Sequence, residues 1–438
     1  MKSVALHNLG CKVNAYEIDV MQQMLQESGY KIVPFDELAD IYIVNTCSVT
    51  NIADRKSRQM LHKARKRNPE ALIIATGCYV QTGQDTSALE ESVDIAIGNN
   101  RKKDIVAIIE AYQNECPEED TIIDINQTDE YEEMQLTKTA EHTRAYIKIQ
   151  DGCNQFCTYC IIPYARGRVR SRSVSHILKE VEGLVANGYQ EIVLTGIHIS
   201  SYGVDWEGPD NLLTLITKLH AIEGLRRIRI GSLEPRIITT EFVQALHLLP
   251  KVCPHFHLSL QSGCDATLQR MNRHYTTQEY RNCVAILRRF YEHPAITTDV
   301  IVGFPGESEE EFEHTEQFLR EIDYYEMHIF KYSKRQGTPA ATMPLQIDSA
   351  LQTRRSSRLQ ALALEQSKRF RTYYLNQPEE VLFEESKQID GKTYWIGHTV
   401  HYVKVGVQTE ENLENCIRTV VPTELFSDNI LLSIEFSK

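Results

Sequence analysis

The sequence predicts an α/β protein of three parts: an N-terminal domain with a parallel sheet, a central partial barrel of six β/α units, and a small C-terminal β-barrel. Three observations predict this fold class. Short apolar runs alternate with helix-like stretches through the N-terminal quarter, which is typical of βαβ units. The alternation then recurs six times from Arg144 onward. From Pro378 only short β-rich runs remain, at the spacing of a five-stranded barrel.

The N-terminal domain is expected over residues 1–112, and its apolar runs end at Cys11, Cys47 and Cys78. Loops that follow parallel strands gather along one edge of a sheet, so these three cysteines are predicted to meet in space. A single free cysteine is ordinarily a small buried apolar side chain. Three cysteines at equivalent strand ends instead favour a shared iron–sulfur cluster with one open iron.

An acidic connector is expected over residues 113–142, where a short apolar run at residues 122–125 is predicted to form an edge strand. The central domain is expected over residues 143–372, with helices predicted at residues 173–185 and 308–318. Its six strand-like runs are Tyr146–Gln150, Glu191–Thr195, Arg227–Ile230, His255–Leu260, Thr298–Val302 and His328–Tyr332. The C-terminal barrel is expected over residues 375–438, with strand-like runs at Val381–Phe383, Tyr394–Ile396, Tyr402–Val405, Ile417–Val421 and Ile430–Ile434.

The loop after the first strand of the central domain carries Cys153, Cys157 and Cys160 in a C-x3-C-x2-C pattern. Three thiolates on one loop can hold three irons of a 4Fe–4S cluster and leave the fourth iron open to a small molecule. Structural zinc is the alternative, but zinc sites usually close with four ligands, and no second cysteine pair lies nearby. The spacing therefore favours an iron–sulfur cluster.

Polar groups at the remaining strand ends are candidate contacts for a small cofactor bound at that open iron. Each has an ordinary structural alternative, because a Gly-Phe-Pro-Gly-Glu run often forms a turn and a buried glutamate often caps backbone. Their order behind the cysteine loop favours the cofactor interpretation for Thr195, Gly196, Ser232, Glu234, Gln261, Ser262, Asp299 and Gly303.

The composition agrees with a reducing cytoplasm and with metal-binding thiols. The chain has 438 residues and eleven cysteines, and it shows neither a signal peptide nor an apolar run long enough to span a membrane. We therefore expect a cytoplasmic protein without a membrane partner. The cysteines outside the two triads have no motif partners and are expected to be incidental: Cys116, Cys253, Cys264, Cys283 and Cys416.

Nine collinear motifs resemble the methylthiotransferase family of radical S-adenosylmethionine (SAM) enzymes over essentially the whole chain. They are the Cys153 loop with Ile162–Gly167 behind it, Gly10–Asn14, Asn45–Cys47, Gly77–Tyr79, Ser232–Pro235, His257–Gly263, Met271–Tyr275, Gly303–Glu307 and Tyr332–Ala340. The central domain then corresponds to a radical SAM partial (β/α)6 barrel, and the C-terminal barrel is similar to a TRAM domain.

The resemblance implies two 4Fe–4S clusters and SAM as cofactors. The cluster on Cys153, Cys157 and Cys160 would reduce SAM to methionine and a 5′-deoxyadenosyl radical, with Tyr159 against the adenine. A second SAM would supply a methyl group to sulfur at the Cys11/Cys47/Cys78 cluster. An aromatic C–H is not acidic enough for a side-chain base, which is why radical chemistry is required. The reaction also needs a sulfur donor and an electron donor such as flavodoxin or ferredoxin.

Three branches of the family differ in substrate: N6-threonylcarbamoyladenosine in tRNA, N6-isopentenyladenosine in tRNA, and an aspartate of a ribosomal protein. Here the first cysteine motif reads Gly-Cys-Lys-Val-Asn at residues 10–14. It resembles the threonylcarbamoyladenosine branch, whereas the others typically read Gly-Cys-Gln-Met-Asn and Gly-Cys-Pro-Lys-Asn. The expected function is therefore methylthiolation of C2 of this adenosine at position 37, in the anticodon stem-loop of tRNA. The other two substrates are the alternatives.

Charge gives a mixed indication about RNA. The net charge of −13 argues against general polyanion binding, and the C-terminal barrel is acidic, which would suit a basic ribosomal protein. Runs of basic residues free of acids favour an RNA path, although a solvated helix face is the ordinary alternative. A further run lies at residues 354–371, and the barrel's aromatic residues could stack on bases or simply pack. The predicted RNA contacts are Arg55, Lys56, Arg58, Lys63, Arg65, Lys66, Arg67, Arg166, Arg168, Arg170, Arg172 and Lys404.

A nonenzymatic iron–sulfur protein that binds RNA as a redox sensor is the alternative from another functional class. Such a protein would not need the series of cofactor-like strand ends from Thr195 to Glu307. Reductive cleavage of SAM to 5′-deoxyadenosine separates the two interpretations.

Overall fold

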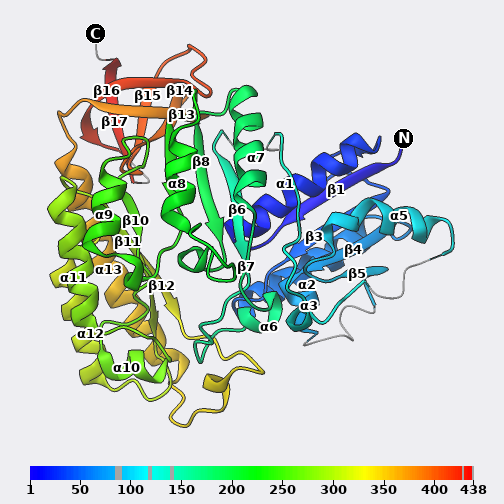
Figure 1. Cartoon of the computed structure of the whole chain (residues 1–438), viewed down its shortest axis with the longest axis horizontal. Helices are drawn as coiled ribbons and strands as arrows, with labels where there is room; N and C mark the ends of the chain where they lie inside the picture. Colours follow the sequence, from blue (N-terminus) through cyan, green and yellow to red (C-terminus); the bar gives the residue numbers. More distant parts are fainter. Residues whose placement is uncertain (84–90, 117–120, 139–142, 427–428, 437–438) are drawn as a thin grey trace.

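In the computed structural model, which describes residues 1–83, 91–116, 121–138, 143–426 and 429–436, the first five strands form one parallel sheet (Figure 1). Its order is β2-β1-β3-β4-β5, with β1 at Ser3–Asn8, β2 at Lys31–Ile32, β3 at Ile41–Thr46, β4 at Leu72–Gly77 and β5 at Ile95–Ile97. The connecting helices include α1 (Lys12–Glu27), α2 (Asn51–Arg67), α3 (Cys78–Thr82) and α5 (Ile105–Gln113). The predicted parallel sheet is confirmed.

The connector contains no strand within its described residues, so the edge strand predicted at residues 122–125 is wrong. Its backbone is engaged in other ways: Gly98 donates to the Thr121 carbonyl, and the Gln81 amide donates to the Ile123 carbonyl. Asp124 then caps a short 3-10 helix at Ile125–Gln127. Residues 117–120 and 139–142, which carry part of the predicted acidic run, lie outside the described residues.

The central domain contains the six predicted parallel strands, divided between two sheets. One sheet orders β7-β6-β8-β9 and the other β10-β11-β12, and a parallel bridge between Leu233 and Leu258 joins them. The strands are β6 (Ala145–Asp151), β8 (Glu191–Gly196), β9 (Arg227–Ile230), β10 (His255–His257), β11 (Ala295–Val302) and β12 (Glu326–Lys331), with antiparallel β7 at Arg170–Ser171. The partial (β/α)6 barrel is confirmed.

Helices cover the outside of this partial barrel, as Figure 1 shows for its left flank. They begin at caps that the sequence supplies, because Ser173 caps α7 (Val174–Ala186) and Ser308 caps α12 (Glu309–Ile322). The other helices are α6 (Ile162–Arg166), α8 (Leu212–His220), α9 (Thr240–His247), α10 (Asp265–Arg270), α11 (Thr277–Phe290) and α13 (Ser349–Tyr373). None of the described helices is long and apolar enough to cross a membrane.

The last five strands close into the predicted barrel, which packs against the start of β9. The strands are β13 (Glu379–Ile389), β14 (Lys392–Thr399), β15 (Lys404–Gln408), β16 (Ile417–Leu425) and β17 (Ile430–Phe436), in the closed order β13-β14-β15-β17-β16. Arg227 donates to the carbonyls of His398 and Glu380, and Arg229 donates to the Thr399 carbonyl at 3.2 Å. The C-terminal barrel therefore closes the base of the partial barrel.

Candidate metal centres

Cys11, Cys47 and Cys78 lie together at the carboxyl edge of the N-terminal sheet. Cys11 precedes α1, Cys47 follows β3, and Cys78 begins α3. Burial raises the pKa of Cys47 to about 12, and the charges of Cys78 and Cys11 raise it further. A Cβ atom added at Gly77 would lie 2.5 Å from the Thr46 carbonyl, so only glycine lets these strand ends approach so closely. The fold thus brings three thiols from distant parts of the chain to one place.

Asn14 and Arg166 join this triad to a fully buried charge network. The Asn14 amide donates to the carbonyls of Leu9 and Thr46, and Arg166 donates to Asn14 Oδ1 at 2.8 Å and to Cys78 Sγ at 3.3 Å. Arg166 also pairs with Glu17, which contacts the Nζ atoms of Lys102 and Lys148 at 2.9 Å each. Although burial raises the pKa of Glu17, these cations hold it well below its usual range. The network places positive charge directly against a candidate metal ligand.

The Cys153 loop is held by its own backbone and by two other segments. Cys153 N donates to the Gly167 carbonyl at 3.0 Å, and Cys160 N donates to the Cys157 carbonyl at 2.9 Å. Thr158 bonds through its backbone to Met271 and Ala340. Burial raises the pKa of Cys153 to about 11 and that of Cys160 to about 12. In this triad Cys157 is buried, and Cys153 and Cys160 are half-buried.

Arg273 supplies the charge at this second triad. Its Nη1 donates to Cys157 Sγ at 3.2 Å, and its Nε donates to the Tyr275 hydroxyl at 3.1 Å. Each triad therefore has one buried arginine on one sulfur. An iron–sulfur cluster held by three thiolates carries negative charge, which these guanidinium groups complement.

The spacing of the sulfur atoms tests the zinc alternative. Among the described residues, one group brings three potential ligand atoms within 4.8 Å of one another, and it is His257, Asp299 and His328 rather than either cysteine triad. Three sulfurs at about 2.3 Å from one zinc ion would lie only about 3.8 Å apart. In the described structure, neither cysteine triad brings its three sulfur atoms within 4.8 Å of one another, so both are wider than one zinc ion requires.

Several predicted cofactor contacts lie at the barrel mouth beside the Cys153 loop. Glu234 lies 3.3 Å from His198 Nε2 and 3.9 Å from Arg273, while its Oε1 is buried without a hydrogen-bond partner. Burial raises the Glu234 pKa, but His198 and Arg273 lower it overall, so the carboxylate stays charged. A buried acceptor of this kind fits the amino group of SAM. Thr195 and Gly196 end the neighbouring strand β8.

Tyr159 and Gln261 are two further predicted cofactor contacts. Tyr159 packs in an apolar cluster with Phe304, Tyr332 and Met271, and its ring meets Phe304 edge-on at 6.4 Å. Gln261 has a left-handed backbone (φ 68°), and it bonds through its backbone to Asp299 and Ile301.

Among the other predicted cofactor contacts, Ser262 and Gly303 are covered by neighbouring side chains. The Ser262 hydroxyl is buried 3.3 Å from Thr315 Oγ1, and Gly303 N donates to Glu307 at 2.7 Å while Gln352 covers its Cα. Ser232 is exposed at the strand end. Ser262 and Gly303 thus hold the fold together beside α12 and α13 and present no free polar side chain to the mouth.

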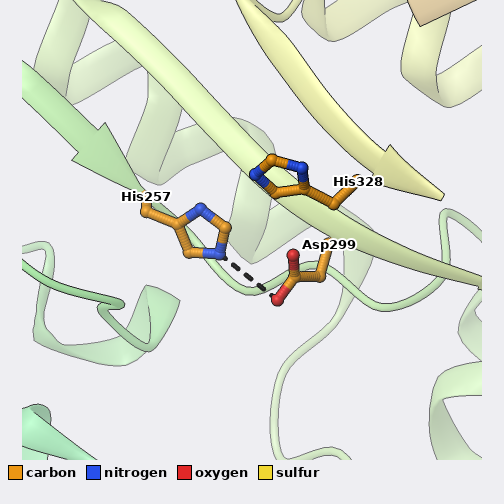
Figure 2. A group of neighbouring side chains, drawn as sticks. All are labelled: His257, Asp299 and His328. Carbon is orange, nitrogen blue, oxygen red and sulfur yellow. Dashed lines mark ion pairs between the residues drawn. The ribbon is translucent and has the colours of Figure 1, made fainter. Parts of the chain in front are cut away.

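The inner face of the partial barrel carries polar side chains. His257, Asp299 and His328 come from adjacent strands and point toward one another (Figure 2). His257 Nε2 lies 3.4 Å from Asp299 Oδ2, its Nδ1 lies 3.0 Å from Thr297 Oγ1, and its ring stacks on His328 at 6.1 Å. Asp299 was among the predicted cofactor contacts, whereas neither histidine was predicted as a site residue. Their alternation with apolar residues along the strands was the available signal.

Arg335, which the sequence analysis also missed, fixes the loop after β12 against the start of α2. It donates to Asn51 Oδ1 at 2.7 Å, to Asp54 Oδ2 at 2.5 Å and to Ser48 Oγ at 2.8 Å, and it is fully buried. A cavity of about 560 Å³ lies beside this joint, lined by Asn51, Asp54, Arg58, Tyr79, Lys334 and Gln336, among others. The joint links the loop that contacts Thr158 to the loop that carries Cys47.

The predicted RNA contacts divide sharply by burial. Arg166, Arg170 and Arg172 are at most 1% exposed, and Arg172 is paired with Glu133 and Glu180. They cannot reach a phosphate, which corrects the prediction for these three residues. Arg168 is exposed, with its guanidinium 4.5 Å above the Phe156 ring. Lys404 is exposed at the start of β15, near Glu326.

The basic run on α2 is only partly available to RNA. Lys63 and Arg67 pair with Asp36, Arg65 pairs with Asp94 at 2.7 Å, and Arg58 donates to the Tyr79 hydroxyl. Arg55, Lys56 and Lys66 are exposed, and no ion pair joins them to another described residue. On α13, Arg355, Arg358 and Arg369 pair with acids. The barrel residue Tyr402 stacks between His255 of the central domain and His398, so its ring is not free to stack on a base.

Comparisons with known proteins agree with this arrangement. The Radical SAM superfamily model matches residues 147–319, and the model described as "Uncharacterized protein family UPF0004" matches residues 3–98. A Bacillus subtilis relative named "Threonylcarbamoyladenosine tRNA methylthiotransferase MtaB" is 41% identical over 94% of this chain and 92% of its own length. A Finegoldia magna relative named "tRNA-2-methylthio-N(6)-dimethylallyladenosine synthase" is 36% identical over 86% of this chain and 83% of its own length.

Among solved structures, the radical SAM methyltransferase TsrM from Kitasatospora setae matches with a TM-score of 0.59 at 14% identity, covering 78% of this chain and 77% of that one. This match shows the shared fold. The B. subtilis and F. magna relatives cover nearly their whole length at more than a third identity, which shows the family. The chain therefore belongs to the radical SAM methylthiotransferase family, whose enzymes use 4Fe–4S clusters and SAM.

Proposed function

We propose that this enzyme adds a methylthio group to C2 of N6-threonylcarbamoyladenosine at position 37 of tRNA. One observation carries the proposal: two cysteine triads are held in a fixed relation by shared elements. Arg166 at the end of α6, six residues after Cys160, donates to Cys78 of the other triad. The Arg335 loop contacts both the Cys47 loop and the Cys153 loop. A two-centre reaction on one substrate atom needs such fixed spacing.

The roles of the two triads follow from their surroundings. We assign Cys153, Cys157 and Cys160 to the cluster that binds SAM, because Glu234 Oε1, which makes no hydrogen bond, lies 3.9 Å from the same Arg273 that donates to Cys157. We assign Cys11, Cys47 and Cys78, within residues 1–112, to the auxiliary cluster that handles sulfur. When bound, SAM and its cluster supply the one-electron chemistry that removes hydrogen from an unactivated aromatic carbon.

The chain's own residues bind SAM, offset the charge of the thiolates and shield the site from water. Glu234 is placed to accept a hydrogen bond from the amino group of SAM, and Tyr159 offers an aromatic face at the same mouth. Arg166 and Arg273 offset the negative charge gathered at the thiolates. The C-terminal barrel closes the bottom of the partial barrel. An adenine inserted between the triads is thereby kept from bulk water.

The substrate assignment is supported by the relatives and by the charges of the C-terminal barrel. The four relatives at the top of the comparison carry names for the threonylcarbamoyladenosine enzyme. The acidic barrel first suggested a basic protein substrate instead. Several of its acids turn toward the central domain, where Glu384 pairs with Arg144 at 3.1 Å and Glu380 pairs with Arg227 at 3.0 Å. Glu384 and Glu380 therefore pair with arginines where the barrel meets the central domain, and they are not evidence for a basic protein substrate.

The predicted RNA contacts that are exposed and make no ion pair with another described residue can bind the phosphates of an anticodon stem-loop. Arg55 and Lys56 in the first turns of α2 and Arg168 beside the Cys153 loop are on the side of the two triads, Lys66 lies in the last turn of α2, and all four can hold phosphates. A single-stranded loop can extrude its base at modest cost. We also propose a cytoplasmic setting, a sulfur donor, and a reductant such as flavodoxin or ferredoxin, since the reaction consumes both sulfur and electrons.

One enzyme preparation tests the function. Anaerobically reconstituted protein is offered four substrates: tRNA with the threonylcarbamoyl group, the same tRNA without it, isopentenylated tRNA, and ribosomal protein. Mass spectrometry should find methylthio product on the first substrate at a rate at least about tenfold above the others. Preference for isopentenylated tRNA or for protein would overturn the substrate assignment.

A further inference from the structure

The loop after β12 forms one wall of the cavity of about 560 Å³ between the N-terminal and central domains. The opposite wall is the beginning of α2 together with Tyr79, the residue that follows Cys78. Lys334 lies on the loop wall and is exposed, and its ammonium group makes no hydrogen bond or ion pair with another residue that the structure describes. The cavity therefore contains a cation that can bind a ligand.

The loop that carries Lys334 is fixed at both ends. The Asn51 side-chain amide, on the opposite wall, donates to the Lys334 carbonyl at 3.1 Å. Farther along the loop, Ala340 N donates at 2.8 Å to the carbonyl of Thr158, which belongs to the Cys153 loop. The cavity is thus preformed beside segments of both triads, and a ligand does not have to order the loop when it binds.

The charges that line the cavity favour an anion. The lining includes two cations, Arg58 and Lys334, and one carboxylate, Asp54. Arg335 donates to Asp54 Oδ2 at 2.5 Å and offsets its charge. The protein as a whole has a net charge of −13, so this cavity is a local concentration of positive charge on an acidic chain. Such a site attracts phosphate groups.

The shape and surroundings of the cavity favour a nucleotide over a protein partner. A volume of about 560 Å³ is that of a small-molecule site, whereas redox partners dock over broad surfaces. Two apolar side chains next to Asn51 in the sequence, Val49 and Ile52, are 53% and 58% exposed. A nucleotide combines an anionic phosphate with a base that can cover apolar groups of this kind.

We propose that this cavity binds the backbone phosphate of a nucleotide next to adenosine 37 in the anticodon loop, and that Lys334 is its principal charged contact. This inference rests on the proposed function and adds a site that positions its substrate. Because the cavity is joined to segments of both triads, a phosphate held there fixes the place at which the neighbouring adenine enters between them.

The test uses the full-length enzyme with both clusters loaded and a series of threonylcarbamoylated anticodon stem-loops. Each stem-loop carries a neutral methylphosphonate at one linkage of the loop. In the unmodified enzyme, one linkage next to adenosine 37 should weaken binding by about 10-fold when it is neutral. Lys334→Gln should weaken binding of the fully charged stem-loop to the same extent, lower the salt slope by about one, and no longer respond to that linkage. Lys334→Arg should keep the response. Fluorescence anisotropy measures binding, and mass spectrometry measures the methylthio product.

Lys331→Gln is the matched control, because Lys331 is an exposed lysine at the end of β12 whose Nζ donates to Thr353 on α13. It should bind every stem-loop as the unmodified enzyme does. Equal responses of Lys334→Gln and the unmodified enzyme at every linkage would overturn the inference, while product on the fully charged stem-loop would leave the proposed function intact.

A second measurement separates RNA from the electron donor. If Lys334→Gln slows formation of 5′-deoxyadenosine with flavodoxin as the reductant but not with dithionite, the cavity serves the electron donor and the inference is wrong. We expect equal rates with both reductants. The proposed function itself fails only if the unmodified enzyme forms no methylthio product on any threonylcarbamoylated stem-loop.

Discussion

The two cysteine triads are built in opposite ways. The Cys153 triad lies within one loop that local backbone bonds close, whereas Cys11, Cys47 and Cys78 follow separate strands and meet only when the sheet has formed. Yet each receives one arginine from outside itself, since Arg166 lies 3.3 Å from Cys78 and Arg273 lies 3.2 Å from Cys157. The arginine of the N-terminal triad comes from the central domain.

The Cys11/Cys47/Cys78 triad therefore depends on assembly of the whole molecule. Without the central domain, Cys78 would lose its cationic neighbour and Glu17 would lose Arg166 and Lys148. The Cys153 loop needs only Arg273 and the backbone of its own domain. Perturbations of the domain joint should therefore reach the auxiliary triad first.

The largest effect is expected from removing the radical triad. A Cys153→Ala/Cys157→Ala/Cys160→Ala variant should form neither 5′-deoxyadenosine nor methylthio product, with rates below about one thousandth of the parent enzyme. Its iron content after reconstitution should fall from about eight to about four per chain, because the auxiliary triad remains. Stoichiometric zinc without iron in the parent enzyme would refute the cluster assignment for both triads.

Removal of Arg166 tests whether assembly controls the auxiliary centre. Arg166→Gln leaves Glu17 and Asp151 with less positive charge in a buried network, and breaking such a pair typically costs about 3–5 kcal/mol. The variant should lose auxiliary iron and thermal stability while it retains the Cys153 cluster. Arg273→Gln is the mirror variant and should lose the Cys153 cluster selectively. Equal loss of both clusters in both variants would contradict the independence of the two sites.

A smaller effect is expected on tRNA binding from the exposed cations of α2. Reversing the charges at Arg55, Lys56 and Lys66 should weaken binding about 10-fold or more for every tRNA sequence and should reduce the salt slope by about three. Arg65→Glu is the control, because Arg65 already pairs with Asp94 and should affect stability more than binding. Titrations of tRNA at several salt concentrations make this measurement. An unchanged salt slope would place the RNA elsewhere.

The smallest effect concerns pH. Iron binds thiolates, so loading competes with protons, and burial raises the pKa of Cys153 to about 11. Arg273 acts in the opposite direction and lowers that pKa. Loading of the Cys153 triad in metal-free protein should therefore rise with pH, and Arg273→Gln should shift its midpoint to higher pH. Iron titrations between pH 6 and 9 should leave the auxiliary midpoint of this variant unshifted. A shift to lower pH would show that Arg273 has another role.

Much of the fold and both triads could be predicted from the sequence, because they depend on local patterns. Cys11, Cys47 and Cys78 stand directly behind apolar runs, and parallel strands bring such ends together. Residues 122–125 were mispredicted as a strand because Ile123 accepts from the side-chain amide of Gln81, far along the chain, and the backbone bond of Gly98 goes to the preceding residue, Thr121.

The misassigned arginines have the same physical origin. Arg166, Arg170 and Arg172 stand in a run without acids, which favoured solvent or RNA. The partner of Arg166 is Glu17, which lies 149 positions away, and burial follows from that pairing. Arg335 was missed for a related reason, since its partner Asp54 comes from another domain. Charge patterns along a sequence show which residues are basic and leave open whether distant acids meet them.

The division of labour between the triads is tested most directly by measuring two products in one variant. A Cys11→Ala/Cys47→Ala/Cys78→Ala enzyme, reconstituted and supplied with reductant, SAM and threonylcarbamoylated tRNA, is assayed for 5′-deoxyadenosine and for methylthio nucleoside. We expect 5′-deoxyadenosine to form with no detectable methylthio product, since the Cys153 loop keeps its own hydrogen bonds and Arg273. Methylthio product at the parent rate would contradict the auxiliary role of the N-terminal triad.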